Sequence, residues 1–107
     1  MTITTYITIG NSDDKLGQER WSSFVTQVDM ALRVDAVSPV ARRHGVWFSR
    51  PDAPWQNACW CVEVRPECVE ELRGRLAQLA GLFGQDSIAW APAPVVEFLG
   101  PQTAVAR

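Results

Sequence analysis

The apolar residues of this chain change from a spacing of two to a spacing of three or four, and they do so twice. Over residues 3–9, every second position is a β-branched residue suited to a buried face, which is typical of a strand. From Gln18 the spacing becomes helical, and residues 18–33 are predicted to form an amphipathic helix. Each element must bury one face, so the chain is constrained to a layered domain of sheet and helix.

Three further strands are predicted in the remainder of the chain. An edge strand is expected within residues 38–49, because Pro39 is not tolerated in a central strand. Residues 58–64 alternate strictly and predict a strand with one buried face. Residues 87–90 and 95–99 are expected to form one last strand that is broken or bulged at the prolines between them.

A second helix is predicted between these strands. Pro66 fits its first position, where a missing N–H costs nothing, and the apolar face runs on to Phe83. Gly84 is expected to form its C-terminal cap, and Gly17 to form the N-cap of the first helix.

The resulting order, β-α-β-β-α-β, is that of an α+β ferredoxin-like sandwich. Right-handed crossovers would place both helices on one face of a four-stranded antiparallel sheet, with the first and third strands central. The length of 107 residues suits one core. Residues 1–99 are therefore expected to form a single domain, and residues 100–107 a flexible tail.

Composition excludes several classes of function. A net charge of −2 and a pI near 5.3 argue against a nucleic-acid partner. No apolar run reaches the length of a membrane span, and the first residues lack the pattern of an export signal. The protein is therefore expected in the cytoplasm, where an odd set of three cysteines would stay reduced.

No residue pattern indicates an active site. His44 is the only histidine, and a pair with Cys59, Cys61 or Cys68 would need a supporting motif that the sequence lacks. Cys59-X-Cys61 has the wrong spacing for zinc, and the loop after the first strand has no phosphate-binding pattern. We predict no catalytic residue, no metal and no cofactor.

One polar corner is predicted from the topology. If the first and third strands are antiparallel neighbours, the loop after one meets the loop before the other, beside the start of the first helix. The candidate ligand- or partner-binding residues are Asn11, Ser12, Asp13, Asp14, Trp55, Gln56 and Asn57. The alternative is structural: the two aspartates cap the helix, and the amides satisfy the loop backbone.

The sheet face away from the helices is expected to be uncovered. Its predicted members are Thr4, Tyr6, Thr8, Cys59, Cys61 and Glu63. This mixed face makes a homodimer possible in principle, since two-fold dimers are the commonest oligomers.

Three segments carry a resemblance to known proteins. They are YIxIGNSDDKL (residues 6–16, where x is any residue), PDAPWQNACWC (51–61) and QDSIAW (85–90). Together they resemble a group of small uncharacterised proteins of actinobacteriophages and actinobacterial genomes, over roughly residues 4–99. The resemblance implies a phage or prophage accessory protein acting inside a bacterial cell, and it carries no functional residue with it.

Two functions remain open at this point. The first is a non-enzymatic module that binds a host or phage protein through a sheet face or the Trp55 corner. The second is a protein that binds a polar small molecule or nucleotide, or an enzyme acting on one, at the Asn11–Asp14 and Trp55–Asn57 corner. A flat apolar patch would favour the first, and a deep pocket with convergent polar groups the second.

Overall fold

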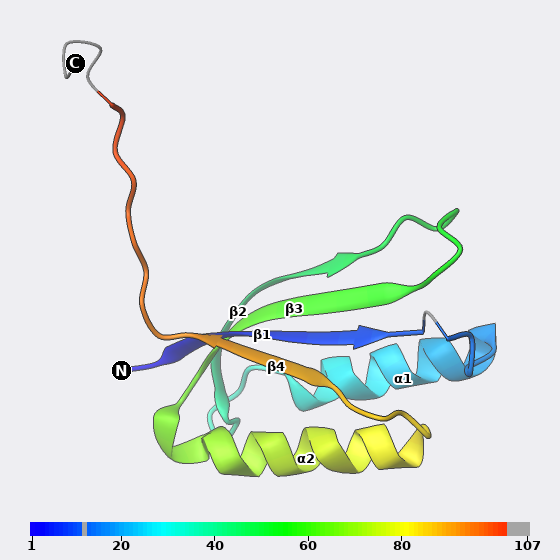
Figure 1. Ribbon diagram of the computed structural model, residues 1–107. Helices are drawn as coiled ribbons and strands as arrows, with labels where there is room; N and C mark the ends of the chain where they lie inside the picture. Colours follow the sequence, from blue (N-terminus) through cyan, green and yellow to red (C-terminus); the bar gives the residue numbers. More distant parts are fainter. Residues whose placement is uncertain (12, 103–107) are drawn as a thin grey trace.

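The computed structural model describes residues 1–11 and 13–102. Its elements follow the predicted order and are shown in Figure 1. They are β1 (Ile3–Gly10), α1 (Gln18–Ala31), β2 (Val40–Phe48), β3 (Asn57–Val64), a 3-10 turn (Pro66–Cys68), α2 (Val69–Leu82) and β4 (Ala89–Ala93). The prediction of a ferredoxin-like α+β fold is confirmed.

The four strands form one antiparallel sheet in the order β2-β3-β1-β4. β1 and β3 are therefore central, as predicted, and their register runs from Ile3 opposite Val64 to Gly10 opposite Asn57. Both helices lie on the same face of the sheet (Figure 1). β2, one of the two edge strands, has two bulges, between Val40 and Arg42 and between Arg43 and Gly45.

The core lies between that face and the helices. Alternate residues of the central strands are buried there, because successive strand side chains point to opposite faces. From the sheet they are Ile7, Ile9, Ala58, Trp60, Val62 and Val64, and from the helices Trp21, Phe24, Val28, Leu72, Leu76 and Leu79. The two helices meet through Phe24 and Phe83, whose stacked rings lie 4.9 Å apart. None of the described helices is long and apolar enough to cross a bilayer.

The end of α2 follows the predicted glycine cap. Gly84 has a φ of +63°, its N–H donates to the carbonyl of Gly81 at 3.1 Å, and the N–H of Gln85 donates to Ala80 at 2.8 Å. This is the Schellman arrangement, which satisfies the last helix carbonyls.

We expect Gly84→Ala to lower the free energy of unfolding by about 1 kcal/mol, because a positive φ is unfavourable for alanine. Urea denaturation would measure the loss, and Gly81→Ala, inside the helix, should instead be neutral or stabilising.

Two predictions about helix and strand ends were wrong. Pro66 begins a separate 3-10 turn, and α2 proper starts at Val69. The last strand ends at Ala93, and residues 95–99 do not pair. The physical reason is that Ala93 already faces Thr4, next to the start of β1, and Pro94 has no N–H to continue the ladder.

Residues 94–102 leave the sheet as an extended segment, here called the arm (Figure 1). The Cα radius of gyration is 16.6 Å, whereas a compact domain of this length has about 13 Å. The predicted boundary at residue 99 thus falls inside the arm. Of the predicted tail, residues 103–107 lie outside the described part of the chain.

Candidate functional site

The structure brings Asn11 and Gln56 together at the predicted corner. The N–H of Asn11 donates to the carbonyl of Gln56 at 2.7 Å, so the loops after β1 and before β3 meet. The Asn11 side chain is buried, and its Nδ2 donates to the carbonyl of Leu16 at 2.7 Å. Its Oδ1 accepts from the N–H of Leu16 at 3.0 Å. The Asn11 amide is therefore committed to the loop that enters α1.

Gln56 extends this network to the helix. Its Oε1 lies 3.4 Å from Nδ2 of Asn11, and its Nε2 donates to Oε1 of Gln18 at 3.2 Å. Close packing continues at Gly10, where an added Cβ would lie 2.6 Å from Oδ1 of Asn57. The corner is thus tightly packed around its amides.

The two aspartates lie on the solvent side of this corner. Asp13 accepts from the N–H of Lys15 at 3.3 Å and also forms an exposed ion pair with the Lys15 side chain. Asp14 has a φ of +57°, a conformation that aspartate tolerates better than most residues. Neither residue caps α1, whose N-cap is Gly17 without a side-chain bond, so that part of the structural alternative was wrong. Ser12 lies outside the described residues.

Trp55 lies in the loop between β2 and β3 and is 52% exposed. The same hairpin exposes two further aromatic side chains, Trp47 at 59% and Phe48 at 51%. These three residues are called the hairpin aromatics below. Trp47 pairs with Cys59 on the uncovered sheet face, whereas the Phe48 ring packs edge-on against Trp60, 6.4 Å between centroids. The hairpin therefore presents aromatic surface on both sides of the sheet.

Trp47 and Phe48 were not among the predicted site residues. A signal for them existed in Val46-Trp47-Phe48, three successive apolar residues in an edge strand. Successive strand residues point to opposite faces, so at least one of the three had to turn away from the core.

Short-range bonds hold the hairpin end in one geometry. The N–H of Ser49 donates to the carbonyl of Asn57 at 3.0 Å, and the N–H of Asn57 donates to Oγ of Ser49 at 2.9 Å. Arg50 donates two hydrogen bonds to Asp52, from Nε to Oδ1 at 3.1 Å and from Nη2 to Oδ2 at 2.9 Å. The backbone that bears the hairpin aromatics is thus held by these hydrogen bonds.

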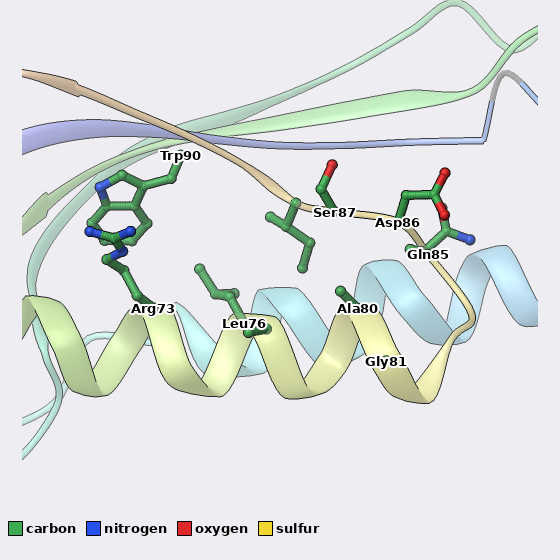
Figure 2. Close-up of a pocket in the computed structure, with 10 residues that line it drawn as sticks. Arg73, Leu76, Ala80, Gly81, Gln85, Asp86, Ser87 and Trp90 are labelled. Carbon is green, nitrogen blue, oxygen red and sulfur yellow. The ribbon is translucent and has the colours of Figure 1, made fainter.

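A groove of about 490 Å³ lies elsewhere, between α2 and β4 (Figure 2). Leu76, Ala77, Ala80 and Ile88 supply apolar lining. At one end the Arg73 guanidinium stands over the Trp90 ring, 6.0 Å from its centroid. Gln85 and Asp86 lie at the other end (Figure 2). None of the predicted corner residues that the structure describes lines this groove or the smaller hollow beside Met30 and Arg33.

The uncovered sheet face has the membership that was predicted, with the opposite residues of β1 and β3 buried. His44 adds a hydrogen-bonding group, because its Nε2 lies 2.8 Å from Oε2 of Glu63. Hydrogen bonds from Thr2 and then His44 lower the pKa of Glu63 against the opposing effect of desolvation. A side-chain hydrogen bond with Cys61 raises the pKa of Tyr6. The middle of this face is therefore polar and charged.

Neither a metal-binding cluster nor the histidine–cysteine pair considered from the sequence is assembled in the described part of the chain. His44 contacts Glu63 and not a thiol, and Cys59, Cys61 and Cys68 are free. No group of three potential metal-binding side chains occurs among the described residues. No family model, curated protein or solved structure matches this chain.

Proposed function

We propose that this protein is a non-enzymatic binding module that engages another protein through the end of its β2–β3 hairpin. The observation that carries the proposal is the exposure of the hairpin aromatics, each more than half accessible on a bonded scaffold. Tryptophan is enriched among the residues that dominate binding energy at protein interfaces. A scaffold that is already ordered loses little conformational entropy on binding.

The biological setting of the proposal comes from the sequence resemblance. It is a phage or prophage accessory protein in the cytoplasm of an actinobacterial cell, and its partner is a host or phage protein. The net charge of −2 supports a protein rather than a nucleic acid as the partner.

The competing function, binding of a polar small molecule or nucleotide at the corner, has less support. Such a ligand needs polar groups that are free to bind it. The side chain of Asn11, the most buried amide of the corner, already hydrogen-bonds Leu16 through both Nδ2 and Oδ1. The groove with apolar lining lies between α2 and β4, and none of the described corner residues lines it.

Affinity capture with matched baits tests the proposal. The tagged chain and a Trp47→Ala/Trp55→Ala double variant would be incubated with an actinobacterial host lysate, and bound proteins quantified by mass spectrometry. We expect a specific partner whose recovery falls at least about tenfold with the double variant, because truncating a central interface tryptophan typically costs about 2 kcal/mol or more.

Leu82→Ala supplies the control, since Leu82 is a 70% exposed apolar residue at the end of α2, away from the hairpin. Circular dichroism would establish that all baits are folded. Equal capture by all three baits would place the interface elsewhere, and the absence of any specific partner would count against the binding function itself.

A further inference from the structure

The arm exposes four large apolar side chains within five residues. Val95, Val96, Phe98 and Leu99 are 61–89% accessible, and none of them is a member of the core cluster. Soluble monomers rarely leave large apolar side chains contiguous and uncovered, so such a segment marks an interaction site.

We propose that the arm packs into the groove between α2 and β4 of a second copy of this chain, and that two copies exchange arms reciprocally. The groove offers a lining complementary to the arm, with Leu76, Ala77, Ala80 and Ile88 along it. Its volume of about 490 Å³ falls within the range of sites that hold compact ligands or several side chains. In Figure 2 the lining residues extend from Trp90 and Arg73 at one end to Gln85 and Asp86 at the other.

Charge complementarity supports this occupant. Glu97 is the charged residue of the described arm, and it lies between Val96 and Phe98. Two charged residues line the groove, Asp86 at one end and Arg73 at the other, where Arg73 stands over Trp90. The ion pair of Arg73 with Glu70 is long, at 3.5 Å, and exposed. An arm lying in the groove brings a carboxylate to this guanidinium, while its neighbours meet apolar lining.

The local sequence explains why the arm goes to another copy. To enter its own groove, the chain would have to reverse direction directly after Ala93. The residues available for that turn are Pro94, Val95 and Val96, and no glycine, asparagine or aspartate is among them. β-Branched valines do not adopt the positive φ of tight turns, and prolines stiffen the extended form. Exchange between copies fills the groove without a reversal, as in domain swapping.

The surface involved is sufficient for a dimer. Four large apolar side chains amount to on the order of 500 Å² per arm. Two exchanged arms together remove on the order of 1,000 Å² of apolar arm surface from solvent, to which the groove surfaces that they cover are added, and a specific interface buries at least about 1,000 Å² in total. This dimer differs from one across the uncovered sheet face, and the two can be told apart.

Sedimentation velocity on the full chain between 1 and 200 µM tests the proposal. We expect a dimer whose dissociation constant rises at least about tenfold in a Phe98→Ser/Leu99→Ser variant and in an Ala77→Glu variant. Ala77 is exposed and lines the groove, so a glutamate there blocks it without entering the core. Gln78→Glu, which adds the same charge to the same helix outside the groove, should leave the dimer intact.

A labelled peptide of residues 94–102 provides an independent measurement. By fluorescence anisotropy it should bind the Phe98→Ser/Leu99→Ser chain, whose groove is empty, and should lose at least about tenfold in affinity when Ala77→Glu is added. A monomer at 200 µM would overturn the proposal. So would a dimer that resists the arm variants but dissociates with Tyr6→Arg, because its interface would then be the uncovered sheet face.

Discussion

Asn11→Ala is expected to lower the free energy of unfolding by about 2–4 kcal/mol. The Asn11 side chain satisfies both the N–H and the carbonyl of Leu16, and both residues are buried. Alanine would leave a donor and an acceptor unpaired away from water, and each such group costs about 1–3 kcal/mol. For a domain of this size the loss corresponds to a fall in Tm of roughly 10–20 °C. Thermal and urea denaturation would measure it.

Asn57→Ala is the matched control, because it removes the only other asparagine, a half-buried residue of the same corner. We expect it to cost less than about 1 kcal/mol. Asn11→Asp should fall between the two, since a carboxylate still accepts from the N–H of Leu16 but no longer donates to its carbonyl. If Asn11→Ala is as mild as Asn57→Ala, the amides are not holding the loop, and a binding role for the corner gains support.

The meeting of Asn11 with Gln56 shows what the sequence could predict. Strict alternation in residues 3–9 and 58–64 identified two strands whose buried faces both needed helices. Their antiparallel pairing follows from the topology, and with it the position of two loops at one end of the sheet. Which polar groups would be satisfied there depended on side-chain directions within irregular loops, and periodicity carries no information about those.

Three other features lay beyond the sequence for separate reasons. The position of Trp47 on the uncovered face depends on the register of β2 against β3. The two bulges of β2 shift this register, and no residue pattern in the sequence predicted them. The end of β4 depends on where its neighbour β1 starts, and so on another part of the chain. The groove exists because α2 and β4 leave space between them, a matter of tertiary packing.

The contact of Asp29 with Trp60 also joins distant parts of the chain. Its loss is expected to lower the free energy of unfolding by the second large amount predicted for this protein. Trp60 is fully buried in β3, and its Nε1–H donates to Oδ1 of Asp29 on α1 at 2.9 Å. Arg43 of β2 pairs with the same carboxylate. We expect Asp29→Ala to lower the free energy of unfolding by about 2–3 kcal/mol, because the buried indole N–H loses its acceptor and the guanidinium its partner. Urea denaturation at pH 7 would measure this.

A matched variant separates this contact from an ordinary surface ion pair. Asp52→Asn breaks the exposed ion pair between Asp52 and Arg50, which is also an arginine–aspartate pair. Exposed pairs of this kind contribute about 0–1 kcal/mol to the free energy of unfolding. Asp29→Asn keeps an oxygen for the indole but not the charge facing Arg43, so its loss should be smaller than that of Asp29→Ala. Equal, small losses in all three variants would mean that Trp60 does not depend on Asp29.

The pH dependence of Asp29→Asn follows from the sign of the pKa shift. Partial burial alone would raise the pKa of Asp29, but hydrogen bonds from Arg43 and Trp60 and the charges of Arg43 and Arg33 outweigh it and lower the pKa below the ordinary 3.8. As the pH falls, Asp29 is therefore protonated in the unfolded chain before it is protonated in the folded chain. The stabilisation is complete above about pH 4 and declines as the pH falls through the folded pKa. The natural chain should thus lose its advantage over Asp29→Asn progressively as the pH falls below about 4, as followed by urea midpoints at each pH. An advantage that does not change as the pH falls below about 4 would show that the charge of Asp29 contributes nothing to it.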